Sequence, residues 1–400
     1  MKNYGIIAEY NPMHYGHLYQ IRKIREMDSD AIIITIISTF FVQRGEASFL
    51  DPKYKTKAAL SNGADLVLAL PTLFSLQSAE NFAYGALSIL NQTKNIDHLV
   101  FGAESDYNKL WDFAKFQLEK APLIEEKRIE FMDGGCNYNQ GLIKACRMVG
   151  EKIGLEISDD LFQSNNILAL EYLKSLIRLN SSISPLCIRR SGHRYNETKI
   201  TEGQYPSATA IRKYFKEDPS AVKNILPEES YQGLLKSSFI DDSSLFNLIS
   251  YKLVIERTSL THITGYEEGL ERHLRKNVLL SENYVEFIEN SATKRYRKTR
   301  IQRFLINMLL ENTAEFVDKS IGQKPEWVRV LGFNKKGQDF LRHSKEKSDL
   351  IYLTQFKQYS ALMPFAKKQF DKEADSCNLY YFSNKHYDDY FRWIPVVIKD

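Results

Sequence analysis

The sequence has few cysteines, and their spacing argues against exported and zinc-binding proteins. The four cysteines among the 400 residues form no Cys-x-x-Cys pair and lie far apart, at Cys136, Cys146, Cys187 and Cys377. Paired cysteines are the usual sign of a disulfide framework or a structural zinc site. We therefore expect reduced thiols and a cytoplasmic location.

Long apolar runs and an excess of one charge are also missing. The N-terminal apolar run ends at Glu9, too early for a signal peptide or a membrane-spanning helix, and no other run reaches that length. The 54 Lys and Arg residues nearly balance the 50 Asp and Glu residues, for a net charge of +4. Because so small a surplus produces a weak field, nucleic-acid binding would have to rest on local clusters of basic residues. We expect no contact with a membrane.

The first half of the chain alternates strand-like and helix-like segments. Helical patterns begin near Gly16 and cover 52–62 and 167–179. The apolar, strand-like runs between them are 4–8, 31–37, 66–70, 99–101 and 184–188. This rhythm predicts an α/β fold with a doubly wound parallel sheet.

The second half of the chain has a mainly helical pattern of residues. Residues 221–315 read as helices rich in Leu, Ile, Lys, Arg and Glu, and two possible strands follow at 328–333 and 350–354. We expect a catalytic ATP-binding domain over 1–217 and a mainly helical, basic domain over 218–400.

The most informative segment follows the first strand directly. Asn11-Pro12 predicts a turn, because a residue before proline avoids the helical region. His14 and His17 are three residues apart and share one face of a helix that begins there, while Gly16 lets a ligand approach the backbone. A helix N-terminus binds phosphate, and two imidazoles there could donate hydrogen bonds to it. Such a pair alone could also be a helix cap, a solvent-facing pair or two ligands of a metal.

Strand, turn, His-x-Gly-His and helix in this order resemble the HxGH nucleotidyltransferase superfamily. A second signature of that superfamily, a Ser/Thr-rich turn that opens a helix with a basic residue close behind, matches residues 206–212. Here Ser207 would cap the helix and Arg212 would reach the outer phosphates. The alternative for this segment is an ordinary capped surface helix.

A narrower resemblance covers nearly the whole chain. Ten segments in order are similar to the tRNA(Met) cytidine acetate ligase family, among them GIIAEYNPMHYGHLYQI, FFVQRGEASFLDPKYKTKAALSNGADLVLALP, LVFGAES, NNILALEYLKSL, CIRRSGHRYN, PSATAIRKYF and TKRYRKTRIQRFL. The resemblance implies a ligase that uses ATP, with Mg²⁺, to convert acetate to acetyl-adenylate. It then implies transfer of the acetyl group to N4 of the wobble cytidine in elongator tRNA(Met), with no obligate protein partner.

The resemblance also implies the site residues. The catalytic residues would be His14, His17 and Arg212. The ATP-binding residues would be the segment Ile7, Ala8, Glu9, Tyr10, Asn11, Pro12, Met13, His14, Tyr15, Gly16, His17, Leu18, Tyr19 and Gln20, with Gly102, Asn165 or Asn166, Arg189 or Arg190, and Ser207. From the residues alone, the asparagines could be helix caps, the arginines surface charges and Gly102 a turn glycine.

Basic residues cluster in the second half, most densely over 293–303. Clustered Lys and Arg supply much of the affinity for RNA, and Tyr296 within the run could stack on an unpaired base. The alternative is a solvated charged face. We expect tRNA contacts from Arg44, Arg272, Arg275, Lys276, Lys294, Arg295, Arg297, Lys298, Arg300 and Arg303. Arg44 could instead position the acetate carboxylate.

The sequence departs from the family pattern in three places. Ser38-Thr39-Phe40-Phe41 lacks the usual glycine and polar residue, Asn196 replaces a histidine, and Met13 replaces phenylalanine. The first change could alter the pocket for the acyl group. The competing functions are a small-molecule adenylyltransferase and a tRNA-binding protein with impaired catalysis.

Overall fold

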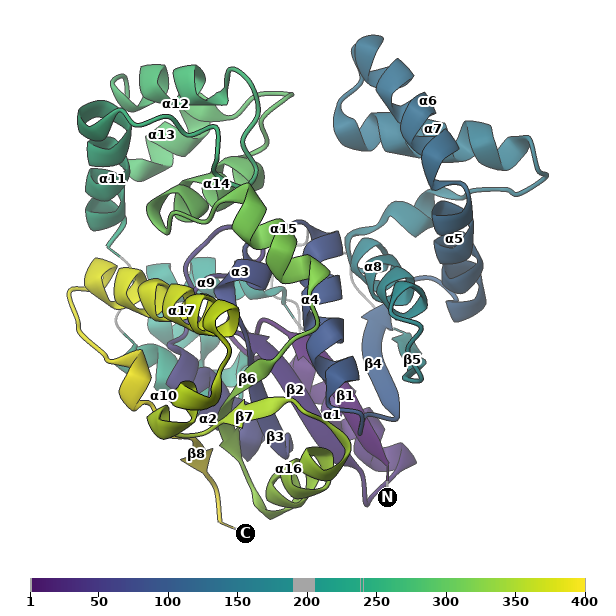
Figure 1. Cartoon of the computed structure of the whole chain (residues 1–400), viewed down its shortest axis with the longest axis vertical. Helices are drawn as coiled ribbons and strands as arrows, with labels where there is room; N and C mark the ends of the chain where they lie inside the picture. Colours follow the sequence, from purple (N-terminus) through teal and green to yellow (C-terminus); the bar gives the residue numbers. More distant parts are fainter. Residues whose placement is uncertain (1, 190–205, 238, 240, 400) are drawn as a thin grey trace.

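A computed structural model describes residues 2–189, 206–237, 239 and 241–399. Within these residues the centre of the molecule is a single 8-stranded sheet (Figure 1). Its strands are β1 Asn3–Ala8, β2 Ile32–Ser38, β3 Leu66–Leu70, β4 His98–Ala103, β5 Ser184–Arg189, β6 Trp327–Phe333, β7 Ile351–Leu353 and β8 Val396–Val397. All the strands that the sequence predicted are present.

The strand order explains where a ligand can bind. The order is β5-β4-β1-β2-β3-β6-β7, with β8 paired to β6. Strands β5, β4, β1, β2 and β3 are parallel, as predicted, and β6 joins β3 antiparallel. The chain moves from β1 outward to β2 and β3, then returns to place β4 on the other side of β1. In open α/β sheets, ligands bind beyond the carboxyl ends of the strands at such a reversal, here between β1 and β4.

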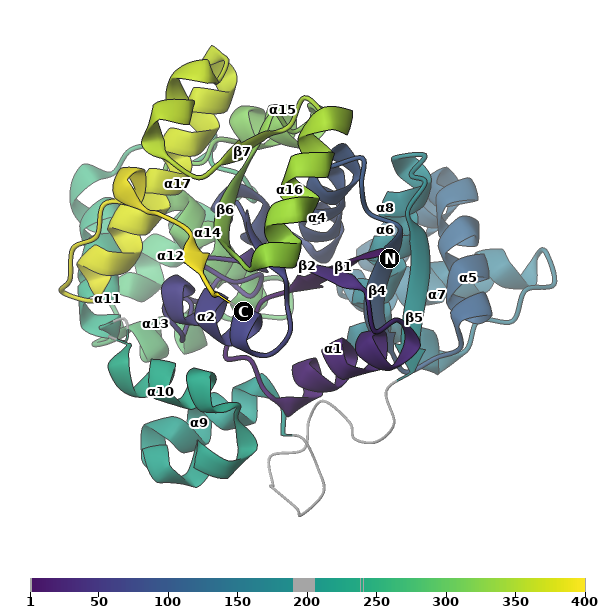
Figure 2. The same cartoon turned by 90° about the horizontal axis from the view of Figure 1, so that it is seen from below.

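Strand β2 shows why these runs form a buried sheet. Every residue of Ile32–Ser38 is buried, which suits a central parallel strand covered on both faces. Because successive side chains point to opposite faces, Ile33 and Ile37 enter one core while Ile34 and Ile36 enter the other. The first core includes residues of α1 and α2, and the second includes residues of α4, α8 and α16 (Figure 2).

The helices that surround the sheet occupy most of the chain. They are α1 Tyr15–Met27, α2 Pro52–Ser61, α3 Thr72–Ser75, α4 Ala79–Gln92, α5 Tyr107–Glu119, α6 Ala121–Asp133, α7 Tyr138–Glu151, α8 Ser164–Arg178, α9 Ala208–Glu217, α10 Glu228–Lys236, α11 Asp242–Ser250, α12 Leu270–Val278, α13 Tyr284–Ser291, α14 Lys298–Leu309, α15 Ala314–Gly322, α16 Lys335–Lys347 and α17 Pro364–Ser383. No helix in the described ranges is both long enough and apolar enough to cross a membrane.

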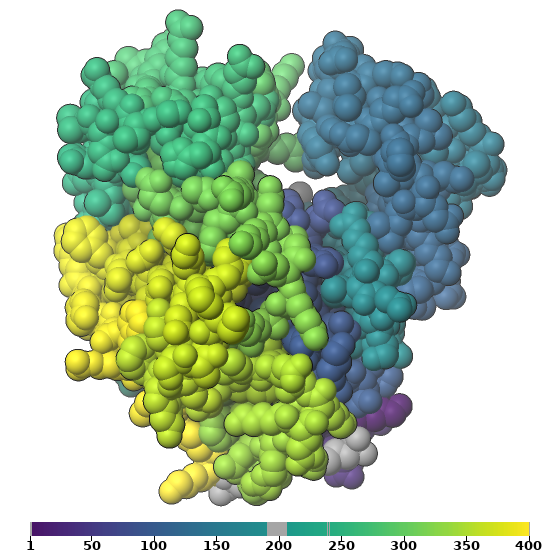
Figure 3. Space-filling view, viewed as in Figure 1, coloured from purple at the N-terminus to yellow at the C-terminus, as the bar shows by residue number. Residues whose placement is uncertain are grey.

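Two groups of helices project from the same end of the molecule. One is the α5–α7 unit, residues 107–151, and the other is the α11–α14 unit, residues 242–309. Figure 3 shows an open hollow between them, with the α11–α14 unit in green and the α5–α7 unit in blue. One hydrogen bond links the two sides, from Arg297 Nη2 to Asn137 Oδ1 at 3.4 Å.

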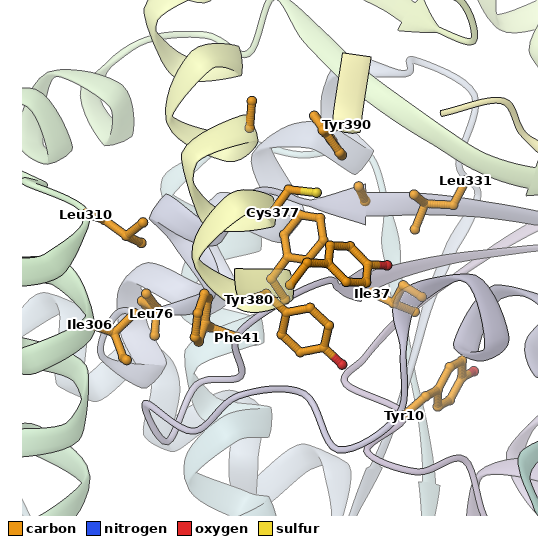
Figure 4. Close-up of a cluster of buried hydrophobic side chains, with 14 of the residues drawn as sticks. Tyr10, Ile37, Phe41, Leu76, Ile306, Leu310, Leu331, Cys377, Tyr380 and Tyr390 are labelled. Atoms are coloured by element: carbon orange, nitrogen blue, oxygen red, sulfur yellow. The ribbon is translucent and has the colours of Figure 1, made fainter. Parts of the chain in front are cut away.

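The C-terminal half contributes to the sheet as well as to the helices. Strands β6, β7 and β8 extend the sheet of the first half, and α17 packs beside it. Figure 4 shows the cluster that joins these parts, with Phe41 after β2, Ile306 and Leu310 at α14, and Cys377 and Tyr380 on α17. The division at residue 217 therefore stays a prediction about function, since both parts share one sheet.

Candidate active site at the carboxyl edge of the sheet

The His-x-Gly-His segment forms the turn between β1 and α1. His14 is the N-cap of α1, and its Nδ1 accepts the backbone N–H of Gly16 at 3.1 Å. His17 Nδ1 accepts the backbone N–H of His14 at 3.2 Å. The two rings lie 3.9 Å apart between centroids, so they share one face as predicted.

These hydrogen bonds determine which ring nitrogen carries a proton. A nitrogen that accepts a backbone N–H has no proton of its own, so a neutral ring holds its proton on Nε2. Each imidazole, when neutral, therefore carries its proton on Nε2. Donors of this kind, aimed at a phosphate that gains charge, are what adenylyl transfer requires.

Two residues before the histidines hold this turn in place. Tyr10 is buried with a positive φ of 44°, and its ring meets the His17 ring edge-on at 5.1 Å. Asn11 Oδ1 accepts the backbone N–H of Phe49 at 2.6 Å. A non-glycine residue in the left-handed region costs free energy, and such strain is common at functional sites.

Arg212 comes to the same turn from a distant part of the chain. Ser207 caps α9, as predicted, by accepting the backbone N–H of Ala210 at 3.3 Å. One turn into α9, Arg212 Nη1 donates to the backbone oxygen of Asn11 at 3.0 Å. The structure thus brings both predicted signatures of the superfamily together.

The neighbouring strand β4 forms the other side of the reversal. Gly102 lies near its carboxyl end, and Gln20 Nε2 of α1 donates to Val100 O of β4 at 3.0 Å. Asn166 is fully buried and uses its amide in hydrogen bonds to Glu104 N, Ser105 N, Ser105 Oγ and Asp160 O. Asn165 is half-buried and donates to the Glu104 carboxylate. Of the two asparagines, Asn165 is therefore the more accessible to a ligand.

The arginine pair is only partly described. Arg189 is the last residue of β5, is exposed, and pairs with Ala103 beside Gly102. Arg190 lies outside the described residues, as does the Tyr195-Asn196-Glu197 departure.

The structure places two ionisable residues that sequence reasoning missed, Lys55 and Glu46, close to the predicted Glu9 and Arg212. Glu9 accepts the backbone N–H of Gln43 at 2.7 Å, and burial raises its pKa. Lys55 of α2 is fully buried and donates to Ser38 O at 3.1 Å; burial lowers its pKa to about 7. Glu46 Oε2 accepts from Arg212 Nη2 at 3.1 Å. No local pattern marks Lys55 and Glu46, because only the fold brings them to Glu9 and Arg212.

Clusters of metal ligands are also absent among the described residues around the turn. Within the part of the chain that the structure describes, no three His, Cys, Asp or Glu side chains gather closely enough to hold a metal ion.

Thr39 and Phe40, where the sequence departs from the family pattern, face α17. Thr39 Oγ1 donates to Glu373 at 2.7 Å. Phe40 is fully buried among Tyr380, Tyr390 and Trp393. These two side chains therefore contact the C-terminal helix rather than the histidine turn.

The basic residues expected to contact tRNA fall into three groups. Arg272, Lys276, Lys294 and Arg297 are exposed on the α11–α14 unit. A second group forms ion pairs with carboxylates, namely Arg275 with Glu271, Arg295 and Arg300 with Glu267, and Lys298 with Glu289. Arg44 and Arg303 form the third group and are half-buried. Arg303 Nη1 of α14 donates to Gln43 O at 3.1 Å, in the loop that follows β2.

The expectation that Tyr296 stacks on a base is wrong. Its ring is 6% exposed, and its hydroxyl donates to Glu268 O at 3.3 Å. The alternation of charge with one aromatic residue suggested an exposed ring, but the chain turns this side chain into the core of the α11–α14 unit.

Comparisons with known proteins agree with this geometry. The family model described as HIGH nucleotidyl transferase matches residues 1–391. The tRNA(Met) cytidine acetate ligase of Caldicellulosiruptor bescii is 36% identical over 100% of this chain and 99% of its own length. The enzyme of the same name from Clostridium novyi is 34% identical over 99% of both chains.

A solved structure is similar over the whole chain. The Thermotoga maritima protein TmcAL, crystallised with alpha-thio ATP, superposes with a TM-score of 0.90 at 28% identity and covers 100% of both chains. The chain belongs to the HIGH nucleotidyltransferase family and, within it, to the tRNA(Met) cytidine acetate ligases.

Proposed function

We propose that this protein activates acetate with ATP and acetylates elongator tRNA(Met). Acetate attacks the α-phosphate of ATP to give acetyl-adenylate and pyrophosphate. N4 of the wobble cytidine then attacks the acetyl carbon, forming N4-acetylcytidine and releasing AMP. The observation that carries the proposal is the meeting of His14, His17 and Arg212 at the reversal between β1 and β4.

The histidines and Arg212 would act on different phosphates. The Nε2–H groups of His14 and His17 would donate to oxygens of the α-phosphate, which gains charge as acetate attacks. Arg212 would bind the departing pyrophosphate, since a guanidinium suits phosphate oxygens. Mg²⁺ would enter with ATP, held mainly by the outer phosphates, because it usually keeps substrate phosphates and water as ligands.

The adenosine would lie along the β4 side of the site. Gly102 would let the nucleoside approach the strand backbone, and Asn165 with Arg189 would bind its polar groups. These assignments are supported by the position of Gly102 at the carboxyl end of β4 and by the half-buried amide of Asn165.

Activation of acetate is chemically necessary for the second step. The lone pair of a cytidine exocyclic amine is delocalised into the ring, so the amine is a weak nucleophile. The mixed anhydride supplies a good leaving group: its C–O bond breaks as the C–N bond forms, and the amine loses a proton. The acetyl group would pass directly from the adenylate to the amine. Burial raises the pKa of the Cys146 and Cys377 thiols, which disfavours their reactive thiolate forms.

We propose that the tRNA binds on the α11–α14 unit. The exposed Arg272, Lys276, Lys294 and Arg297 would contact phosphates, and Arg297 lies at the hollow between the two projecting units. A wobble base is unpaired, so it can enter a protein site without melting a helix.

The test combines the protein with ATP, Mg²⁺, acetate and unmodified elongator tRNA(Met). Nucleoside mass spectrometry should detect an acetylated cytidine that depends on both ATP and acetate and is lost in a His17→Ala variant. Acetate-dependent AMP formation without RNA modification would mean that adenylation works and that the RNA partner is wrong. Pyrophosphate release that requires neither acetate nor RNA would favour a small-molecule adenylyltransferase. RNA binding without pyrophosphate release would favour a tRNA-binding protein.

A further inference from the structure

Arg212 is held between two acceptors on different segments. Nη1 donates to Asn11 O at 3.0 Å, in the turn that precedes His14. Nη2 donates to Glu46 Oε2 at 3.1 Å, with Thr209 Oγ1 at 3.5 Å on its own helix. The guanidinium is planar, so two acceptors at separate nitrogens set both its position and the direction of its remaining N–H groups.

Glu46 lies on a tight loop that is closed by backbone hydrogen bonds. Val42 N donates to Glu46 O at 2.9 Å and Gly45 N donates to Val42 O at 2.8 Å. An isolated β-bridge joins Phe41 to Ala47 across the base of the loop. All these contacts are made by backbone atoms, so none of them depends on the Glu46 carboxylate.

The loop is also fixed from its far side by α14. Gly45 has a φ of +80°, and a Cβ there would lie 2.3 Å from Arg303 N. Arg303 Nη1 donates to Gln43 O at 3.1 Å. Because backbone meets backbone at this junction, the loop presents Glu46 to Arg212 from a rigid base.

We propose that Glu46 is a positioning residue for the adenylation step, acting through Arg212. Its carboxylate orients the guanidinium toward the place where the outer phosphates would lie, beside the histidine turn. The ion pair is partly exposed, with 16% of the Arg212 side chain and 36% of the Glu46 side chain accessible. The carboxylate is thus placed to orient the cation rather than to fill the core. This proposal rests on the proposed function of the site.

A double-mutant cycle separates this role from a structural one. The variants are Glu46→Ala, Glu46→Gln, Arg212→Ala and the double variant Glu46→Ala/Arg212→Ala. The rate of acetate-dependent ATP–pyrophosphate exchange without tRNA gives kcat and KM for ATP. If the exchange rate of a variant falls below detection, the ATP dissociation constants of the same variants, measured by calorimetry, are compared instead.

The proposal predicts a loss that depends on Arg212. Glu46→Ala lowers kcat/KM for ATP by about 10- to 100-fold, the range for a hydrogen bond to a charged group. In the Arg212→Ala background, Glu46→Ala causes no further loss. Glu46→Gln keeps an acceptor oxygen and retains most of the wild-type rate.

The control is Glu80→Ala, which removes another Arg–Glu ion pair between two elements, that of Arg178 on α8 with Glu80 on α4. It should leave kcat and KM unchanged. The proposal would be overturned if Glu46→Ala had wild-type kinetics. It would also be overturned if Glu46→Ala lowered kcat/KM equally in the wild type and in the Arg212→Ala variant. Pyrophosphate exchange by the wild type that ignores acetate would instead contradict the proposed function, while the ATP-binding cycle would still test Glu46.

Discussion

The imidazoles of His14 and His17 do two jobs with their two nitrogens. Each Nδ1 accepts a backbone N–H within the first turn of α1, and this leaves each Nε2 as the protonated nitrogen of a neutral ring. The same contacts therefore begin the helix and orient the donors.

Replacing His17 with alanine should affect catalysis more than ATP binding. The variant loses one donor to the α-phosphate, and losing a single preorganised donor costs about 100- to 1000-fold in kcat. The measurement is acetate-dependent pyrophosphate exchange, with the ATP dissociation constant determined in parallel. A similar fall in ATP affinity, with kcat preserved, would show that His17 binds the ground state instead.

Lys55 should make the stability of the protein depend on pH. Burial lowers its pKa from 10.5 to about 7, so the folded protein releases this proton at lower pH than the unfolded chain does. Between these values the unfolded chain binds more protons, and stability rises with pH. The unfolding free energy of the wild type should therefore rise relative to Lys55→Met from about pH 7 to pH 10, by an amount on the order of a few kcal/mol.

Denaturant unfolding of both proteins across this range checks the prediction. A constant difference between wild type and Lys55→Met would mean that the ammonium stays charged when buried. If the unfolding free energy of the wild type instead fell relative to that of Lys55→Met as the pH rises, the pKa of Lys55 would have to be raised in the folded protein.

At the scale of elements, the junction between the loop 42–46 and α14 connects the site to the α11–α14 unit. The close approach of Gly45 to Arg303 N leaves no room for a side chain. A methyl group added at Gly45 should therefore push the loop 42–46 away from α14.

Gly45→Ala should destabilise the protein more than Gly135→Ala. Both glycines have positive φ, at +80° and +92°, so both substitutions carry the same left-handed penalty. A Cβ at Gly135 meets nothing within 4 Å, whereas one at Gly45 meets backbone. The difference in unfolding free energy should be about 1–3 kcal/mol, the usual cost of overpacking. Equal costs for the two variants would mean that α14 moves away freely.

The local pattern predicted most of the strands because their sequences are mainly apolar. The β-branched run before Ser38 and the apolar residues of Leu66–Leu70 needed no tertiary information. The antiparallel pairing of β6 with β3 could not be predicted, since it joins segments far apart in sequence. The α5–α7 unit was also missed.

The same limit applies to the site. The histidine turn and the α9 cap are local motifs, so the sequence alone predicted them. Glu46 and Lys55 acquire their roles only through contacts with Arg212 and Ser38 O. The prediction of an exposed Tyr296 was wrong, because a run of basic residues does not indicate which of its side chains is buried.

At the scale of the whole molecule, α12 belongs to the helical unit that projects from one end of the molecule, and its residues Arg272 and Lys276 are exposed (Figure 1). If they bind tRNA phosphates, Arg272→Ala should weaken tRNA binding and reduce the slope of log affinity against log salt by about 0.7–1. Filter binding at several salt concentrations measures both. Lys335→Ala, an exposed lysine on α16, is the matched control and should change neither. An unchanged slope in Arg272→Ala would move the RNA surface elsewhere.

The most direct test of the central claim follows the oxygen atoms of acetate. Acetate labelled with oxygen-18 is supplied with ATP, Mg²⁺ and tRNA, and the products are analysed by mass spectrometry. Attack on the α-phosphate leaves one acetate oxygen on AMP when the acetyl group is transferred, so labelled AMP should form in step with acetylated cytidine. Label in inorganic phosphate or pyrophosphate, with unlabelled AMP, would contradict an acetyl-adenylate formed at the His14–His17 turn.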